Sequence, residues 1–372
     1  MIQKILGGIF SLLLILQCFA QTPDSGRFYV GTFTSEGAEG IYLCSFDFST
    51  GEIALIKTFK GIDNPSFMKI SPNRNFLYAV TRPPEKIEKS GGYIQAYKIA
   101  QNGDLEFLNK QISHGSDPCH VDVSPDGKFT AIATYGGGTT SLYTINDDGK
   151  VSPANSTIIN EGSGLTSRQN APHAHAIKFS KNGHQVFSAD LGTDQLNIFD
   201  LIKGKLIPAK QPFVKLPPGS GPRHFDFHPN DDVIYVINEL NSTISVIDRN
   251  GSNREVVQTI STLPDNFSGT SYCADIHVSS DGKYVYGSNR GHNSIAVFKT
   301  DPVSIQLEFL TTVSTHGEWP RNFTLTSDGK FLLVANQHSG NIVVFNLNTQ
   351  TGIPEFSGKE LKLPAPVCLE FL

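Results

Sequence analysis

One histidine, one glutamate and three arginines fall at two fixed places in a pattern that repeats along this chain. They are His175, Arg223, Glu239, Arg290 and Arg321. Imidazole exchanges a proton near neutral pH, and guanidinium groups bind carboxylate and phosphate oxygens through paired donors. Because arginine and glutamate are rarely buried without partners, these five groups, gathered in one place, would suit an anionic, oxygen-rich ligand.

The elements that position these residues are short strands. A strand of alternating apolar residues, a polar turn and a second strand that ends in a polar residue recur about every 50 residues, as in PCHVDVSPDGKFTAIATY and PRNFTLTSDGKFLLVANQ. The turns open at Ser71, Ser124, Ser180, His228, Ser279 and Thr326. A fixed period of this length, built only from strands, indicates the four-stranded blades of a propeller.

The seventh repeat is divided between the two ends of the chain. GRFYVGTF, residues 26–33, supplies only the second strand, and PVCLEFL, residues 366–372, supplies only the first. Joining them pairs two edges that an open array would leave exposed. We therefore predict an all-β fold, a seven-bladed β-propeller closed by pairing of the N- and C-terminal strands in one blade.

Positions in each repeat are counted here from the residue that opens the turn. Because the hairpin is antiparallel, positions −5 and +11 lie at the same rim of the ring, near the mouth of the central channel. Position −5 is Ser66, Cys119, His175, Arg223, Ala274, Arg321 and Val367. Position +11 is Phe33, Arg82, Tyr135, Leu191, Glu239, Arg290 and Gln337. A functional site should break the symmetry of a repeat protein, as this set does. Position +10 is polar in every blade, which favours a structural role there.

The His173-Ala174-His175 segment allows more than one interpretation. Residues i and i+2 of a strand share a face, so the two histidines could hold a metal ion with His120 or His224 as third ligand. The neighbouring arginines would repel a cation, and no carboxylate cluster completes the set. An acid/base or substrate role for His175 and a purely structural histidine are the alternatives. We expect no metal and no cofactor.

The N-terminus has the pattern of a secretory signal. Lys4 provides a positive charge, residues 9–16 are apolar but too short to span a bilayer, and small residues precede Gln21. We therefore predict a signal peptide at 1–20 and a single propeller domain at 21–372. The mature protein would be exported, either periplasmic or secreted. Lipid attachment at Cys18 is an alternative.

Composition narrows the possible partners. The net charge is −5 and there is no basic stripe, which argues against nucleic acid. We expect a monomer without a membrane span that binds a small molecule. Four further cysteines are Cys44, Cys119, Cys273 and Cys368. Three of them fall on inner strands of blades that are not neighbours, so free thiols are expected rather than disulfides.

Several longer strings carry a family resemblance. RQNAPHAHAIKFS, ADLGTDQL, GPRHFDFHP, INEL and SNRGHNSIAVF, in that order along the chain, resemble the seven-bladed lactonase family. That family includes the propeller-type 6-phosphogluconolactonases and the fungal carboxy-muconate lactonizing enzymes. The resemblance implies that His175, Arg223 and Glu239 are catalytic. Asp275 stands where family members often carry glutamate, which leaves a shorter carboxylate at that substrate contact.

The expected reaction is lactone hydrolysis. A histidine with a pKa near neutrality would act as base and then acid at His175, with Glu239 orienting it or sharing the proton. Arg223 would stabilise the oxyanion, while Arg290 and Arg321 would hold an anionic group of the substrate. Further substrate contacts are expected from His173, His224, Asp275 and His120.

From the resemblance, the expected substrate is 6-phosphogluconolactone, which would be hydrolysed to 6-phosphogluconate. That lactone is made in the cytoplasm, whereas this chain carries an export signal, so another sugar lactone would also fit. One rival is a non-catalytic envelope propeller that binds protein or glycan. A quinoprotein dehydrogenase or a WD-repeat scaffold is disfavoured because Trp319 is the only tryptophan.

Overall fold

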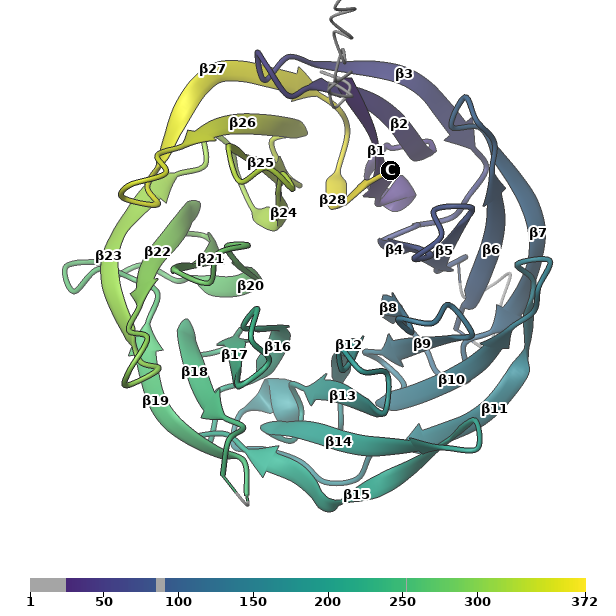
Figure 1. Cartoon of the computed structure of the whole chain (residues 1–372), viewed down its shortest axis with the longest axis horizontal. Helices are drawn as coiled ribbons and strands as arrows, with labels where there is room; N and C mark the ends of the chain where they lie inside the picture. The colour runs from purple at the N-terminus through teal and green to yellow at the C-terminus, as the bar shows by residue number, and fades with distance from the viewer. Residues whose placement is uncertain (1–24, 85–90, 252) are drawn as a thin grey trace, which may run out of the picture.

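The chain forms a closed ring of seven antiparallel sheets around a central channel (Figure 1). The computed structural model describes residues 25–84, 91–251 and 253–372. Each sheet has four strands, and the strands of a sheet follow one another from the channel outward. The predicted signal peptide at 1–20, with Cys18, lies outside the described residues. The seven-bladed propeller expected from the repeat is confirmed.

The first four blades, named in order around the ring, contain sixteen strands. Blade one consists of β28 (Pro366–Phe371), β1 (Ser25–Thr32), β2 (Gly40–Asp47) and β3 (Ile53–Lys60). Blade two consists of β4 (Phe67–Ile70), β5 (Phe76–Thr81), β6 (Tyr93–Ile99) and β7 (Leu105–Ile112). Blade three consists of β8 (Pro118–Val123), β9 (Phe129–Thr134), β10 (Thr139–Ile145) and β11 (Val151–Ile159). Blade four consists of β12 (Ala174–Phe179), β13 (Gln185–Asp190), β14 (Gln195–Ile202) and β15 (Lys205–Lys215).

The remaining three blades complete the ring. Blade five consists of β16 (Pro222–Phe227), β17 (Val233–Asn238), β18 (Thr243–Asp248) and β19 (Glu255–Ser261). Blade six consists of β20 (Tyr272–Val278), β21 (Tyr284–Arg290), β22 (Ser294–Thr300) and β23 (Leu307–Ser314). Blade seven consists of β24 (Pro320–Leu325), β25 (Phe331–Asn336), β26 (Asn341–Leu347) and β27 (Pro354–Lys362). Two 3₁₀ turns, η1 (Thr34–Glu36) and η2 (Ser167–Gln169), lie in connecting loops.

The ring closes as the sequence predicts. β28 pairs antiparallel with β1, with Phe371 opposite Phe28 and Cys368 opposite Gly31. The Phe28 and Phe371 rings pack with their centroids 5.2 Å apart. The last strand of the chain is therefore the innermost strand of the blade that the first strand begins.

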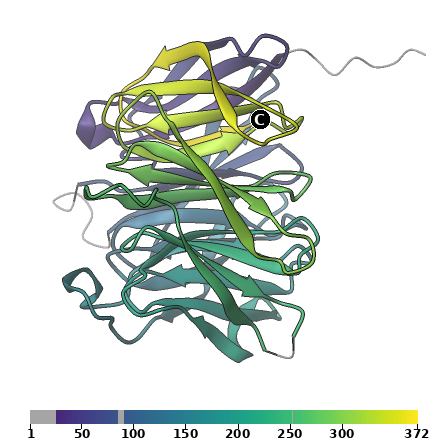
Figure 2. The same ribbon diagram turned by 90° about the vertical axis from the view of Figure 1, so that its left-hand side faces the viewer.

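The apolar core is divided into wedges between neighbouring blades, which stand side by side when the ring is seen edge-on (Figure 2). The middle strands are buried on both faces, whereas outer strands such as β19 alternate between exposed and half-buried residues. One wedge joins Phe187 of blade four to Phe225 and Phe227 of blade five. Burial of both faces explains the nearly continuous apolar runs of the middle strands.

The S-x-D-G-K turns are held by their own side chains. The Ser124 hydroxyl accepts a hydrogen bond from the Phe129 amide at 2.9 Å and donates to Asp126 at 2.7 Å. Gly127 has a φ of 71°, a backbone conformation that side chains rarely adopt. These turns fix the point at which the two inner strands of each blade are joined. They therefore also fix the level in the channel at which positions −5 and +11 lie.

The inner edge of each blade faces the channel and has no neighbouring strand. Polar side chains at positions −4 and −2 of one blade accept backbone N–H groups of the next blade's inner strand. At position −2 the acceptors are Asp122 for Phe179, Asp226 for Val278 and Glu370 for Ile70, at 2.8, 3.1 and 3.0 Å. At position −4 they are Asn322 for Leu369, Asp275 for Phe323 and His120 for Ile177, at 2.7, 3.3 and 3.4 Å. These bonds tie consecutive blades together.

Six of the seven inner strands carry an irregularity in pairing at or beside position −5. The register shifts on either side of Cys119, His175, Arg223, Arg321 and Val367, and across Ala274 and Asp275. A β-bulge leaves its extra residue out of the ladder and changes the direction of the side chain. Consecutive residues Arg223 and His224 therefore contact each other, with 3.2 Å between Nη1 and Nε2. Regular strand alternation would have separated them.

The other expectations about the chain concern thiols and the membrane. Cys44, Cys119, Cys273 and Cys368 are buried free thiols, which confirms the prediction. None of the helical segments within residues 25–84, 91–251 and 253–372 has the length and apolar character needed to cross a bilayer.

Deletion of Pro366–Leu372 should abolish soluble folding, because it removes the innermost strand of blade one and exposes the edge of β1. Soluble yield and thermal unfolding followed by circular dichroism measure the effect. The matched control is a circular permutant that joins Ser25 to Leu372 through a short linker and opens the chain at the exposed Val303. The permutant should unfold cooperatively. A truncated chain with a single transition near that of the intact protein would contradict the closure.

Candidate active site

A buried carboxylate at one rim holds three guanidinium groups from different parts of the ring. Glu239, directly after β17, lies 2.9 Å from Arg168, 3.1 Å from Arg223 and 2.8 Å from Arg290. Arg290 also donates to the Cys273 carbonyl at 2.8 Å. Position −5 of blade five thus meets position +11 of blades five and six, as the register predicts. Glu239 contacts arginines, whereas the sequence suggested that it would orient His175.

The GPRH string sets this geometry through its backbone. Gly221 has a φ of 62°, and its amide donates to Asp194 at 2.8 Å while its carbonyl accepts the Glu239 amide at 2.7 Å. A Cβ at Gly221 would lie 2.4 Å from the Leu240 side chain. Glycine is therefore required where the chain enters β16, and it brings Arg223 and Glu239 to the same level.

Charge pairing dominates the ionisation of this cluster. Burial alone would raise the pKa of Glu239, but Arg290, Arg223 and Arg168 outweigh it and lower that pKa to about 2. Burial and the neighbouring Arg290 lower the pKa of Arg223 to about 10. Both groups therefore remain charged at neutral pH.

A second pair of guanidinium groups lies against Phe33. Arg82 and Arg321 have their guanidinium carbons 4.8 and 5.0 Å from the centre of its ring. Arg82 pairs with Asp117 at 3.3 Å. Arg321 makes no ion pair with any carboxylate of the described residues, and burial together with Arg223 lowers its pKa. The rim therefore carries an excess of positive charge.

His175 lies beside these cations and is 4% exposed. Its ring makes edge contacts with Tyr135 and His224, with centroids 5.7 and 5.3 Å apart. Its Nδ1 is buried and has no hydrogen-bond partner among the described residues. Burial, followed by the charge of Arg223, lowers the pKa of His175 well below the usual histidine range. The sequence-based expectation of a near-neutral pKa for His175 was therefore wrong.

His173 occupies a different environment from His175. In a regular strand, residues two positions apart would share a face. Nδ1 of His173 lies 2.8 Å from the Tyr135 carbonyl, and its ring stacks on the Tyr135 ring at 4.4 Å. The bulge at His175 interrupts the alternation assumed for a metal pair. Within the described ranges, no group of three or more histidine, cysteine, aspartate or glutamate residues could hold a metal ion.

His224, Asp275 and His120 lie one level deeper in the channel. His224 accepts from Arg223 at Nε2, so its proton is on Nδ1 and is donated to Asp275 at 2.7 Å. Burial and Arg223 lower the pKa of His224 to about 4. Asp275 also accepts from His277 at 3.2 Å and from Asn322.

His120 belongs to the same layer. It is 3% exposed, and its ring stacks on Phe67 with centroids 4.0 Å apart. Its edge contact with His224 has a centroid distance of 5.2 Å. His120, His224 and Asp275 contact other protein groups in this layer, and His224 also lines the small cavity beside His175 and Arg223. Their expected contacts with substrate remain a prediction.

Sequence reasoning missed two members of the cluster. Arg168 comes from the loop of η2, and its Nη2 donates to the Tyr135 hydroxyl at 3.0 Å as well as to Glu239. It is the first residue of the RQNAPHAH string, which was the available signal. Arg82 stands at position +11 of blade two, so its place in the register could have identified it.

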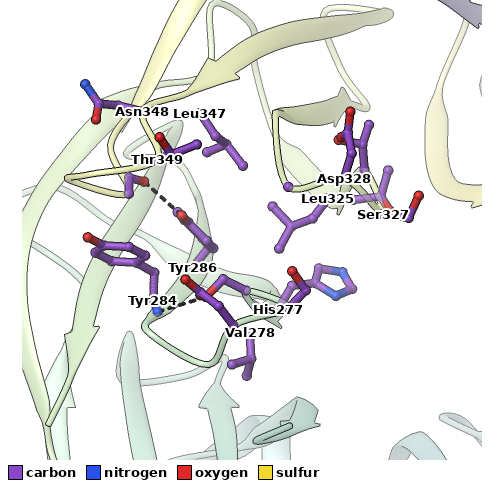
Figure 3. Close-up of a pocket in the computed structure, with 17 residues that line it drawn as sticks. His277, Val278, Tyr284, Tyr286, Leu325, Ser327, Asp328, Leu347, Asn348 and Thr349 are labelled. Carbon is purple, nitrogen blue, oxygen red and sulfur yellow. Dashed lines mark hydrogen bonds between the residues drawn. The ribbon is translucent and has the colours of Figure 1, made fainter. Parts of the chain in front are cut away.

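Two large cavities lie at the other end of the inner hairpins, beside the turns. One of about 390 Å³ is bordered by His277, Tyr284, Tyr286 and Asp328 of blades six and seven (Figure 3). The Tyr286 hydroxyl there donates to the Gly352 carbonyl at 2.9 Å. A comparable cavity of about 530 Å³ lies between blades five and six. Both cavities occupy equivalent gaps between neighbouring blades, so we attribute them to the repeated architecture. The arginine cluster, in contrast, occurs at one part of the ring.

Comparison with protein-family models matches residues 27–371 to the family described as Lactonase, 7-bladed beta-propeller. The chain belongs to this family. The match spans all seven blades, and the family resemblance found in the sequence is confirmed.

Individual relatives agree with this membership. The chain is 37% identical to the 6-phosphogluconolactonase of Bacillus subtilis over 350 residues, which covers 92% of this chain and 97% of that protein. It is 36% identical to the 6-phosphogluconolactonase of Formosa agariphila, with coverage of 87% and 93%. Among solved structures, the periplasmic gluconolactonase of Pseudomonas aeruginosa superimposes with a TM-score of 0.88 at 27% identity, covering 94% of this chain and 99% of that one.

Replacing Glu239 by glutamine should destabilise the protein by about 3 kcal/mol at pH 7, because buried arginines lose their counter-charge. The lowered pKa means that the carboxylate's stabilisation is complete above about pH 4.5 and is lost as the pH falls towards about 2. The variant should lack this acid dependence. Urea unfolding between pH 7 and pH 3 measures both effects.

Glu318→Gln is the matched control, because this exposed carboxylate forms no ion pair with the described residues. It should leave the unfolding free energy within about 0.5 kcal/mol of wild type. A similarly small change for Glu239→Gln would show that the cluster does not depend on its carboxylate.

Proposed function

We propose that this protein is a lactonase that hydrolyses the lactone of an anionic sugar acid at the arginine-rich rim. The observation that carries the proposal is the meeting of an unpartnered buried imidazole, His175, with several fixed guanidinium groups at one mouth of the channel. Family membership supports the reaction class, since two relatives are named 6-phosphogluconolactonase and one gluconolactonase.

In the proposed reaction His175 is the general base and then the general acid. The neutral imidazole takes a proton from water as the water oxygen attacks the lactone carbonyl. It then returns that proton to the ring oxygen as the carbon–oxygen bond of the ring breaks. A positioned acid/base group of this kind accelerates such reactions by about 10²–10⁴-fold. The low pKa of His175 ensures that the free enzyme holds the base form.

Arg223 is the proposed donor to the oxyanion. Its Nη1 is held by the Ala274 carbonyl at 2.6 Å, and its Nε faces Glu239. No hydrogen bond from its Nη2 is formed with a described residue, so this donor is free for substrate. Donors fixed before the reaction need no reorganisation when negative charge develops on the carbonyl oxygen. Glu239 has the role of positioning Arg223 and Arg290.

Arg321 is the proposed contact for the substrate's phosphate or carboxylate, with Arg290 supporting it. Arg321 has no carboxylate partner in the described part of the chain, whereas Arg290 is already bound to Glu239. His173 would line the mouth beside Tyr135. His120, His224 and Asp275 would act from beneath by fixing Arg223. No metal or cofactor takes part in this mechanism, so activity should persist in a chelator.

The expected compartment bears on which lactone is the substrate. With the signal at 1–20, the enzyme would be exported to the periplasm or secreted, and the relative named as periplasmic in Pseudomonas aeruginosa supports this. We propose 6-phosphogluconolactone and unphosphorylated aldonolactones as the substrates to compare. The purified protein should hydrolyse at least one of them faster than it opens spontaneously, with or without chelator. Glycan or protein binding without hydrolysis would instead support a non-catalytic propeller.

His175→Ala should lower kcat/KM by about 10²-fold or more, because the reaction loses its proton acceptor. A continuous acid-release assay, corrected for spontaneous ring opening, measures the change. His184→Gln provides the control, since this exposed histidine of the same blade lies at the turn end, away from the rim. Unchanged hydrolysis by His175→Ala would remove His175 from the mechanism.

The acid limb of the kcat/KM profile should lie below the ordinary histidine pKa of about 6.5, because burial and nearby arginines depress the pKa of His175. Arg321→Gln removes one of those charges and should move the limb to higher pH, while Arg321→Lys should keep it low. Initial rates measured between pH 4 and 8 test both statements. A limb at the same pH in all three proteins would show that Arg321 does not act on His175.

A further inference from the structure

A small cavity lies at the floor of the arginine-rich mouth. Its volume is about 10 Å³, and the side chains that line it include Ser66, Cys119, His175, Arg223 and Arg321, all at position −5. A cavity of roughly this size holds one water molecule if polar partners are present. It is too small for a sugar, so a substrate would lie above it.

Three buried side-chain atoms of its lining residues form no hydrogen bond with the described residues. One of them, Nε of Arg223, lies 3.1 Å from Glu239 in an ion pair. The other two are the hydroxyl oxygen of Ser66 and Nδ1 of His175. Ser66 is 7% exposed and His175 is 4% exposed. Buried polar atoms in folded proteins are normally paired with protein or with ordered water. Two such atoms facing one water-sized cavity therefore point to a shared water.

The Cys119 thiol and, in Arg223, Nε and Nη1 already have partners, whereas Nη2 of Arg223 and the Arg321 guanidinium are the groups assigned above to the substrate. The Cys119 thiol lies 3.3 Å from the His175 carbonyl and 3.6 Å from the Ala174 carbonyl. The guanidinium of Arg223 is directed to Glu239, Ala274 and His224. Ser66 and His175 therefore remain as partners for a water, with Arg321 as a charged neighbour.

We propose that this cavity seats the water that attacks the lactone, and that Ser66 is a positioning residue that holds it against Nδ1 of His175. The inference rests on the proposed function. The water would donate one proton towards Nδ1 and the other towards the Ser66 oxygen. Its lone pair would then face the substrate carbonyl above the cavity.

The step balances with one water and one lactone. The water oxygen forms a bond to the carbonyl carbon, the carbonyl π pair moves to the carbonyl oxygen, and one water proton passes to Nδ1 of His175. The tetrahedral intermediate then re-forms its carbonyl as the bond from carbon to ring oxygen breaks. The ring oxygen receives the proton from Nδ1, which leaves a hydroxy acid and the enzyme in its starting state.

Ser66→Ala should lower kcat by about 10-fold or more while KM stays within about twofold, because the water loses one of its two partners but the substrate contacts remain. Ser66→Val, which also fills the cavity, should lower kcat further. Ser188→Ala is the matched control, since this serine is also buried but its hydroxyl accepts a hydrogen bond from Thr140 away from the site. Thermal unfolding checks that each variant is folded.

A high-resolution crystal structure of the wild-type protein gives a second, independent readout. A single solvent peak within about 3.2 Å of both Ser66 Oγ and His175 Nδ1 is expected. The proposal is overturned if that position holds no solvent, or if folded Ser66→Ala keeps its kcat.

The two proposals fail in different ways. Suppose that His175→Ala loses activity while both Ser66 variants keep full activity. The proposal that Ser66 positions the attacking water would then be refuted, and the lactonase assignment would stand. A solvent peak at this position in a protein that hydrolyses no lactone would refute the assigned reaction instead.

Discussion

The inner edge of each blade is the constraint on which the rest of this structure depends. An innermost strand has a neighbour on only one side, so half of its backbone groups face the channel, where a buried N–H without a partner costs about 1–3 kcal/mol. Side chains from the preceding blade remove that cost, as Asp122 does for Phe179 and Asn322 does for Leu369. Because acceptor and donor belong to different blades, the same bonds fix each blade against the next.

This constraint distinguishes polar, buried residues with a structural role from those available for the functional site. Positions −4 and −2 are occupied with satisfying the backbone, which accounts for His120 and Asp275. Position −5 stands out of the ladder in most blades and is not needed for pairing, so its side chain varies from serine to arginine. Two bulges place Arg223 and Arg321 at this level, and Glu239 holds Arg223 together with Arg290 and Arg168 without neutralising the whole mouth. The result is a preorganised positive surface around a neutral imidazole.

Most of the architecture could be predicted because it depends on residues that are close together in the sequence. The period-2 pattern, the turn chemistry of residues such as Ser124 and Asp126, and the divided seventh repeat determine the blades, their closure and the level of positions −5 and +11. What could not be predicted depends on contacts between distant segments. A bulge has no sequence signal here, so His173 and His175 were assigned to one face. The pKa of His175 depends on arginines from other blades, and Arg168 reaches Glu239 from a loop outside the repeat.

The bulge repeated at one level also has an evolutionary consequence. Because pairing resumes on both sides of it, exchanging that single side chain leaves the hydrogen-bonded ladder unchanged. Ala274 and Val367 fill the level with small apolar groups, and the contact that Ala274 makes to Arg223 uses only its backbone carbonyl. The side chain at this level can therefore differ from blade to blade while the pairing that closes the ring is kept. A scaffold of this kind allows substrate preference to diverge among descendants one blade at a time.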